Sequence, residues 1–250
     1  MKKLLVLKNI EREGPGLFLK IAKEKGFIPE IYNLSLGEKL PEAKKDDLVL
    51  IMGGPMSVRD IDNEKYSWLR EETDFLKRAI ENQISIIGVC LGAQLLAHIL
   101  GGKIEPLKDE SNKENKPEIG WSEISSIDDK SNAEISIIKK ESLKVLHWHG
   151  DRIILPPQAE LLASSNRCRE QLFKVGKLIY GIQFHVETEG LMTSTWIKND
   201  KKFIISGLGK NGQKILKNQC SKFEAITLNE RILFIKKIID KIIEHKKTSL

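Results

Sequence analysis

Cys90 lies in a segment whose residue types suit a catalytic thiol. The apolar run Ile84–Val89 predicts a buried strand, and a helical spacing of apolar residues begins directly after the cysteine. Gly88 and Gly92 stand two residues before and after it, where a sharp strand-to-helix turn leaves no room for side chains. This pattern predicts a nucleophile at the carboxyl end of a central strand, where open α/β sheets bind ligands. A buried, unreactive cysteine is the alternative interpretation of this segment alone.

A thiol nucleophile needs a general base, and the base needs a group that orients it. His185 follows the predicted strand Leu178–Phe184, and Glu187 comes two residues later. Because positions i and i+2 of an extended chain point to the same side, His185 and Glu187 are expected to face each other, with Val186 turned away. A carboxylate beside an imidazole fixes its tautomer and stabilises the imidazolium. The spacing therefore predicts His185 as the base and Glu187 as its orienting group.

Acyl transfer also needs backbone N–H groups directed at the developing oxyanion. The predicted strand Leu48–Met52 ends in Gly53-Gly54-Pro55, and paired glycines let the backbone approach a ligand closely. The N–H groups of Gly54 and Leu91 are the candidate donors. A plain tight turn is the alternative interpretation of the Gly-Gly-Pro segment.

The segment His147–Asp151 contains two histidines at positions i and i+2, followed by an aspartate, a spacing found among metal ligands. No Cys-x-x-Cys or His-Glu-x-x-His motif accompanies it. We therefore expect no metal site, and interpret the segment as a loop that shapes a pocket.

The segment Gly207–Gly212 matches the Gly-x-Gly-x-x-Gly pattern of dinucleotide sites. Too little chain follows it to complete a βαβ unit with further parallel strands. It is predicted to be a glycine-rich connection between helices.

The elements that must position these residues alternate through the first hundred residues. Apolar runs predict buried strands, and amphipathic spacing predicts helices between them. This alternation favours the α/β class, with an open, mostly parallel central sheet flanked by helices on both faces. The predicted strands of this part are Leu4–Leu7, Ile28–Tyr32, Leu48–Met52 and Ile84–Val89.

The second half of the chain has a different pattern. Lys108–Glu118 is dense in charge and predicts a surface loop, and a small β-rich part is expected after it. Beyond Glu187 the pattern becomes helical. The spacing of apolar residues in Ile232–Ile242 predicts an amphipathic C-terminal helix with a basic outer face.

Composition restricts the class of protein. The chain has 250 residues, 40% of them hydrophobic, which is enough for one sizeable globular domain. The net charge is +6, but the lysines are spread along the chain, which indicates a solvated surface rather than a nucleic-acid partner. Three widely spaced cysteines form no disulfide framework and suit a reducing compartment. No segment approaches the ~20 apolar residues that span a bilayer, so a cytoplasmic protein without a membrane partner is expected.

Together the motifs resemble those of the class I glutamine amidotransferase family. The marks of that family are a Gly-Gly-Pro loop, a Gly-x-Cys-x-Gly-x-Gln turn and a Gly-x-Gln-Phe-His-x-Glu strand end. The resemblance covers roughly Lys3–Trp196. Here the three strings occur in the same order, as Gly53–Pro55, Gly88–Gln94 and Gly181–Glu187.

The resemblance implies a catalytic triad. Cys90 would attack the side-chain amide of glutamine and form a γ-glutamyl thioester, while His185 moves protons and Glu187 orients His185. Many members of the family have proline between the histidine and the glutamate. Val186 stands there in this chain and keeps an extended backbone, so little change in geometry is expected.

The resemblance also implies the groups that bind the substrate. The backbone N–H groups of Gly54 and Leu91 would form the oxyanion hole. Gln94 and the backbone of Gly53 would hold the substrate amino acid. The reaction needs no cofactor.

Within the family, Glu118–Trp121 and His149–Asp151 resemble the amidotransferase part of GMP synthase and its stand-alone relatives. GMP synthase also has an ATP-pyrophosphatase domain with a Ser-Gly-Gly-type phosphate loop, and nothing after Glu187 resembles it. We expect residues 1–196 to form the amidotransferase domain and residues 197–250 a helical extension packed on it. A separate synthase subunit is then the expected acceptor of the ammonia.

Two other functions stay open at this point. Because the synthase domain is missing, the chain could instead hydrolyse another γ-glutamyl compound. It could also be a non-enzymatic regulator that keeps the fold and uses Leu191–Leu250 as a docking surface.

Overall fold

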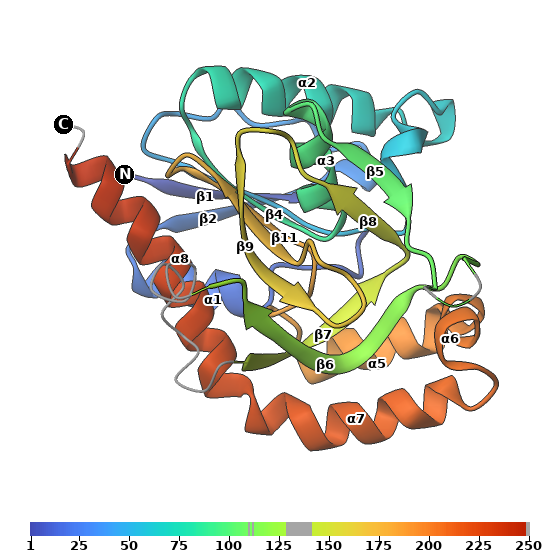
Figure 1. The fold of residues 1–250 in the computed structure, drawn as a ribbon. Helices are drawn as coiled ribbons and strands as arrows, with labels where there is room; N and C mark the ends of the chain where they lie inside the picture. The colour runs from blue at the N-terminus through green and yellow to red at the C-terminus, as the bar shows by residue number, and fades with distance from the viewer. Residues whose placement is uncertain (110, 112, 129–141, 249–250) are drawn as a thin grey trace.

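The computed structural model describes residues 1–109, 111, 113–128 and 142–248 (Figure 1). Among these residues, nine strands form one sheet in the order β2-β1-β3-β4-β11-β10-β9-β6-β7, and β5 and β8 form a separate pair. The strands are β1 (Lys3–Lys8), β2 (Ile28–Asn33), β3 (Leu48–Ile51), β4 (Ser85–Val89), β5 (Lys103–Pro106), β6 (Glu118–Ser126), β7 (Ser142–His149), β8 (Asp151–Ile154), β9 (Ala159–Ser165), β10 (Leu172–Val175) and β11 (Ile179–Ile182).

The helices alternate with the strands in the first half of the chain and follow one another at its end. The α-helices are α1 (Leu17–Glu24), α2 (Trp68–Glu81), α3 (Leu91–Ile99), α5 (Gly190–Asn199), α6 (Lys201–Leu208), α7 (Gly212–Ile226) and α8 (Leu228–Thr248). Short 3-10 helices are η1 (Leu34–Leu36), η2 (Val58–Asp60) and η3 (Glu64–Tyr66).

The large sheet has a parallel half and an antiparallel half. The strands β2, β1, β3, β4 and β11 are parallel, and β10, β9, β6 and β7 continue the sheet in antiparallel pairs. The predicted α/β class with helices on both faces is confirmed. The expected β-rich part is mostly an extension of the central sheet, and the pair β5–β8 was not predicted.

Both faces of the parallel strands β1, β3, β4 and β11 are buried, as the continuous apolar runs predict. Leu4 and Val6 of β1 face a core shared with α1 and α8, whereas Leu5 and Leu7 face a core shared with α2 and α3. Alternate residues of one strand therefore join two hydrophobic cores. A third core lies between β6, β7 and the helices α5–α7.

The prediction that Ile28–Tyr32 is a buried strand was wrong in one respect. The strand forms, as β2, but Ile28 and Ile31 are each 42% exposed. The strand pairs only with β1 and lies at the edge of the sheet. An apolar run alone does not distinguish an edge strand from a central one.

The C-terminal part is helical, as predicted. Gly207–Gly212 connects α6 to α7 rather than forming a strand–helix phosphate loop. Helix α8 buries Phe234, Ile235, Ile238 and Ile239 in the core that contains α1. The predicted boundary at residue 196 falls inside α5. Within the described ranges, no helix combines the length and hydropathy that a membrane span requires.

Candidate active site

Cys90 occupies the turn between β4 and α3. Its φ of 52° is in the left-handed region, which is unusual for a residue with a side chain and is typical of strained functional turns. A Cβ atom on Gly88 would lie 2.5 Å from the carbonyl of Gly92, and one on Gly92 would lie 2.5 Å from the carbonyl oxygen of Ile51. Both glycines are therefore required by the close approach of α3 to the strands, as the spacing predicts.

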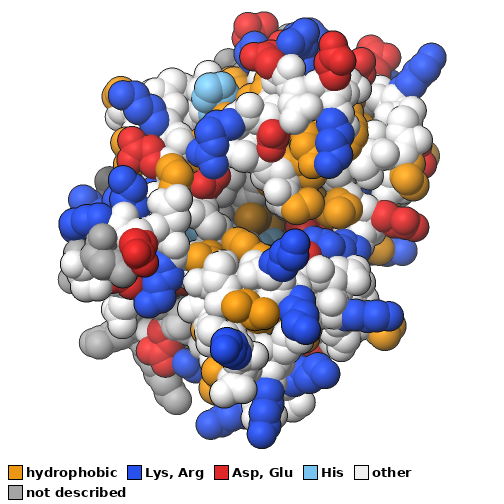
Figure 2. Space-filling model, turned by 90° about the vertical axis from the view of Figure 1, so that its right-hand side faces the viewer, with side chains coloured by type: hydrophobic (Ala, Val, Ile, Leu, Met, Phe, Trp, Pro, Cys, Tyr) orange, Lys and Arg blue, Asp and Glu red, His pale blue; other side chains and the backbone are white. Residues whose placement is uncertain are grey.

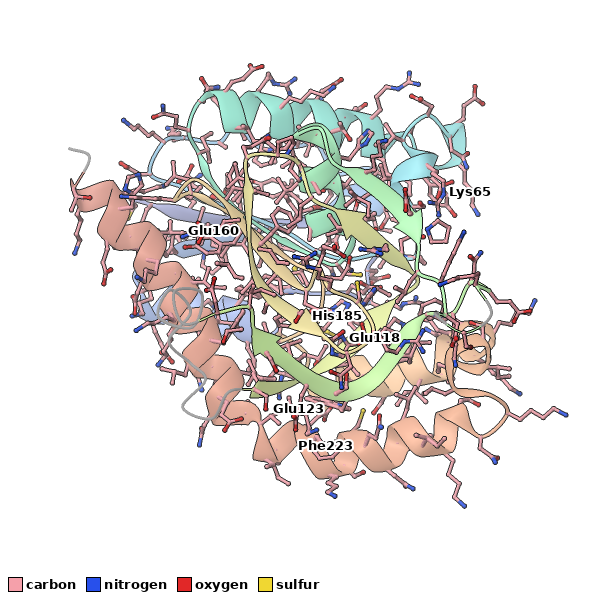
Figure 3. All side chains as sticks on the ribbon, viewed as in Figure 1. Lys65, Glu118, Glu123, Glu160, His185 and Phe223 are labelled. Atoms are coloured by element: carbon pink, nitrogen blue, oxygen red, sulfur yellow. The ribbon has the colours of Figure 1, made fainter. Side chains whose placement is uncertain are left out.

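His185 and Glu187 are in contact. His185 Nδ1 lies 2.8 Å from Glu187 Oε1, and both side chains are buried. The strand β11 ends at Ile182, earlier than predicted, and an isolated bridge to Leu146 holds the histidine instead. The pair thus forms although the chain between its members is bent rather than extended. In Figure 3, His185 lies in the interior of the molecule.

The surroundings of His185 favour its protonated form. Burial by itself would lower the pKa, but the charge of Glu187 and the hydrogen bonds to Cys90 and Glu187 outweigh burial and raise the pKa well above 6.5. The edge of the ring also packs on Trp196, with a centroid distance of 4.8 Å. Glu187 thus holds His185 at a distance of 2.8 Å, and Cys90 is close enough to contribute to the raised pKa of the histidine. A cysteine, a histidine and a glutamate in such proximity can supply a nucleophile, a base and an orienting group.

The Gly-Gly segment after β3 lies against this group. A Cβ atom on Gly53 would lie 3.3 Å from Cys90 Cβ and 3.4 Å from His185 Cε1, and one on Gly54 would lie 3.4 Å from Leu91 Cδ2. In the described part of the chain, neither Gly54 N–H nor Leu91 N–H donates to a backbone carbonyl. Two free N–H groups beside a thiol are able to bind an oxyanion.

A pocket of about 590 Å³ opens in front of Cys90. Gln94 and Gly54 also line it, whereas His185 and Glu187 are buried and do not. Gln94 is held by a hydrogen bond of 3.2 Å from its Nε2 to Gln183 Oε1. Figure 2 shows a hollow near the centre of the molecule, with hydrophobic side chains along its edge and both basic and acidic side chains nearby.

The segment His147–Asp151 was predicted as a loop, but it forms the end of β7 and the start of β8, joined at Gly150. Its residues Trp148–Asp151 line the pocket, as predicted, whereas His147 is buried and does not. The carbonyl oxygen of Trp148 is 3.8 Å from Cys90 Sγ. Both carboxylate oxygens of Asp151 accept hydrogen bonds from Arg59 Nη2, at 3.1 and 3.0 Å. These contacts place the β7–β8 turn over the thiol.

Two residues that contact the backbone around Glu187 were not predicted from the sequence. Arg231 of α8 is buried and donates to the carbonyl oxygens of Val186, at 3.0 Å, and Thr188, at 2.7 Å. A Cβ atom on Gly16 would overlap the carbonyl oxygen of Glu187. A lone arginine in an amphipathic helix gives no sequence signal for such a role, because its partners are backbone atoms of a distant segment.

One buried cluster has the residue types of a metal site. Ligand atoms of Glu118, His147 and His149 lie within 4.8 Å of one another. The Glu118 carboxylate, however, already accepts hydrogen bonds from Ser165 Oγ at 2.7 Å and Gln171 Nε2 at 2.8 Å, and lies 3.1 Å from His149 Nε2. We interpret the cluster as a buried polar network that joins β6 to β7 behind the pocket.

This network predicts loss of stability in acid. Burial lowers the pKa of His147 to about 4, so the unfolded chain binds a proton between about pH 6.5 and 4 that the native chain does not bind. The free energy of unfolding should fall by about 1.4 kcal/mol for each pH unit across this window. Burial opposes ionisation of Glu118, but the hydrogen bond with His149 and nearby histidine charges lower its pKa to about 2, so further stability is lost below pH 4.5.

Urea unfolding at a series of pH values tests this prediction. The variant His147→Asn should show a smaller loss of stability between pH 6.5 and 4 than the wild type. His98→Asn, which removes an exposed histidine, should leave the pH dependence unchanged. Equal slopes for the wild type and His147→Asn would contradict the assignment.

Several known proteins are similar to this chain. The family model described as "Glutamine amidotransferase class-I" matches residues 22–202. A glutamine amidotransferase-like protein of Salmonella typhimurium is 29% identical over 200 residues, which cover 79% of this chain and 81% of that protein. A subunit of the glutamine-hydrolysing GMP synthase of Sulfurisphaera tokodaii is 33% identical over 67% of this chain and 80% of its own length.

A solved structure also resembles this one closely. A glutamine amidotransferase from Thermotoga maritima superimposes with a TM-score of 0.76 and 26% sequence identity, over 94% of this chain and 97% of the other. The residues that the family model matches include β4, α3 and β11, the elements that position Cys90 and His185. The chain belongs to the class I glutamine amidotransferase family.

Proposed function

We propose that the chain is a glutaminase that releases ammonia from glutamine for a separate synthase. The observation that carries this proposal is that Cys90 lines a pocket, with His185 beside the same Gly53 and held by Glu187. A nucleophile within hydrogen-bond reach of a base, itself held by a carboxylate, is the requirement for acyl transfer through a covalent intermediate.

In the first half of the reaction, His185 takes the proton of the Cys90 thiol, and Cys90 Sγ attacks the side-chain carbonyl carbon of glutamine. The N–H groups of Gly54 and Leu91 stabilise the oxyanion that forms. His185 donates a proton to the amide nitrogen, the C–N bond breaks, and ammonia leaves. The product on the enzyme is a γ-glutamyl thioester.

In the second half, His185 takes a proton from a water molecule, which attacks the thioester carbon. The C–S bond breaks, and glutamate leaves as the thiol is restored. Glu187 holds His185 in the required tautomer throughout. Gln94 and the backbone of Gly53 hold the substrate amino acid. The sum is glutamine and water giving glutamate and ammonia.

The choice of ammonia acceptor and the division of the chain are parts of the same proposal. The protein of Sulfurisphaera tokodaii is named as one subunit of GMP synthase, which favours delivery of ammonia to a second chain. We assign residues 1–196 to the amidotransferase domain and residues 197–250 to a helical extension packed on it. Helix α8 shares a hydrophobic core with α1, which supports the packing of the extension on the domain.

Turnover and selective labelling test the proposal together. The purified chain should release equal amounts of glutamate and ammonia from glutamine. A glutamine-like diazoketone should alkylate Cys90 alone, because burial raises the pKa of Cys168 to about 12 and also raises the pKa of Cys220. Peptide mapping by mass spectrometry identifies the labelled cysteine.

The outcomes separate the three functions considered. Labelling without turnover would indicate a site that requires the synthase subunit. Turnover of other γ-glutamyl compounds, but not of glutamine, would favour a γ-glutamyl hydrolase. If Cys90 is not labelled and no substrate is turned over, the non-enzymatic regulatory function is the one that remains.

A further inference from the structure

Glu13 is the one charged side chain around the pocket that lacks a partner among the described residues. It follows β1 in the loop that leads to α1, and its carboxylate makes no hydrogen bond or ion pair there. The other acidic and basic side chains that line the pocket are all in ion pairs. These pairs are Arg12–Asp200 at 2.8 Å, Arg59–Asp151 at 3.0 Å and Lys116–Asp109 at 3.0 Å.

The carboxylate of Glu13 lies beside the reacting groups. Gly53 has no side chain, and a Cβ atom there would overlap Glu13 Oε2 and would lie 3.3 Å from Cys90 Cβ and 3.4 Å from His185 Cε1. The space beside Gly53 thus borders Cys90, His185 and the carboxylate of Glu13. A substrate of the size of an amino acid can reach Cys90 with one end and Glu13 with another.

Leaving this carboxylate buried and unpaired is costly. Glu13 is only 6% exposed, and burial raises its pKa to about 7, although the charges of His185 and Arg12 oppose the shift. A cation bound in the pocket would remove this cost, because a charge-assisted hydrogen bond would replace the lost hydration. The position is therefore prepared for a positively charged group of a ligand.

We propose that Glu13 binds the α-ammonium group of the substrate, an inference that rests on the glutaminase function proposed above. Glutamine has one cationic group, its α-ammonium, and its side-chain amide must lie at Cys90. The same carboxylate repels the α-carboxylate, so it also selects the orientation of the amino acid. The substrate class is then a γ-glutamyl amide with a free α-amino group, and N-acylated glutamine is excluded.

Substrates with and without the amino group test this role. Glu13→Gln keeps the size of the side chain and removes its charge. Its KM for L-glutamine should rise by about 10- to 100-fold, the value of a hydrogen bond to a charged group, while its KM for glutaramate, which lacks the amino group, stays within about threefold. Glu13→Asp should restore part of the affinity for L-glutamine. Glu11→Gln, an exposed change in the same loop, should match the wild type.

A second measurement does not depend on turnover. L-glutamate and glutarate should be compared as protectors of Cys90 against alkylation by iodoacetamide. The wild type should prefer L-glutamate, and Glu13→Gln should lose that preference. If glutamine is not hydrolysed but this preference is found, the proposed function fails and the recognition role stands.

Two results would overturn the inference. One is equal protection by L-glutamate and glutarate in the wild type. The other is a loss of kcat in Glu13→Gln that is the same for both substrates with KM unchanged, which would indicate a proton-transfer role. Misfolding is not expected to obscure these results, because the substitution removes an unpaired buried charge.

Discussion

Cys90→Ala is expected to lower glutamate release from glutamine by at least about 10³-fold, because no other group at the turn can form the thioester. His185→Asn should cause a loss of similar size. Because the two residues act as a unit, the double variant should be no slower than the slower single variant. An enzyme-coupled assay of glutamate measures all three variants under the same conditions.

The control for this prediction is Cys220→Ser. Cys220 lies in α7, its sulfur accepts from Trp121 Nε1 at 3.4 Å, and it does not line the active-site pocket. The rate of glutamate release by Cys220→Ser should stay within about twofold of the wild-type rate, because substitutions near the surface and far from a site usually have small effects. Glutaminase activity that survives Cys90→Ala would refute the proposed nucleophile.

Gly92→Ala is expected to damage both folding and activity. The added methyl group would lie 2.5 Å from the carbonyl oxygen and 2.8 Å from the Cβ atom of Ile51 in β3. The backbone and the branched side chain of Ile51 cannot move aside as a flexible side chain can. The overpacking should therefore destabilise the fold by at least about 2 kcal/mol. The displacement of α3 would move Cys90, and a shift of about 1 Å costs about 10²-fold in rate.

Urea unfolding and glutamate release should be measured on the same preparation of Gly92→Ala. The matched control is Gly14→Ala, because a Cβ atom on Gly14 meets no atom within 4 Å and its φ is outside the left-handed region. That variant should change the free energy of unfolding by no more than about 0.5 kcal/mol. If Gly92→Ala unfolds at the wild-type urea concentration with full activity, α3 does not lie as close to β3 as the structure indicates.

Local patterns in the sequence predicted most of the parallel half of the sheet. Continuous apolar runs located β1, β3 and β4, and amphipathic spacing located α1 and α2. The same patterns could not show that β2 is an edge strand, because neighbours in a sheet are decided by distant segments. The short strands β5 and β8 were missed because their residues are partly polar and their pairing is long-range.

The candidate site also contains residues that the sequence predicts and residues that it does not. The spacing of Gly88, Cys90 and Gly92 predicts the turn, since a tight backbone imposes its requirements on residues that are adjacent in sequence. Glu13 and Arg231 gave no signal. Each is an ordinary charged residue by type, and its importance comes only from burial beside a distant segment.

The sequence by itself determined which residue types are available for the proposed chemistry, because a thiol between two glycines and a histidine two residues before a glutamate are local features. The tertiary structure decided which groups share one pocket. It brings the loop after β3, the turn after β4 and the segment after β11 together at the carboxyl ends of parallel strands. It also leaves the Glu13 carboxylate buried and unpaired among them, because burial and pairing are properties of packing, which no short string of residues specifies.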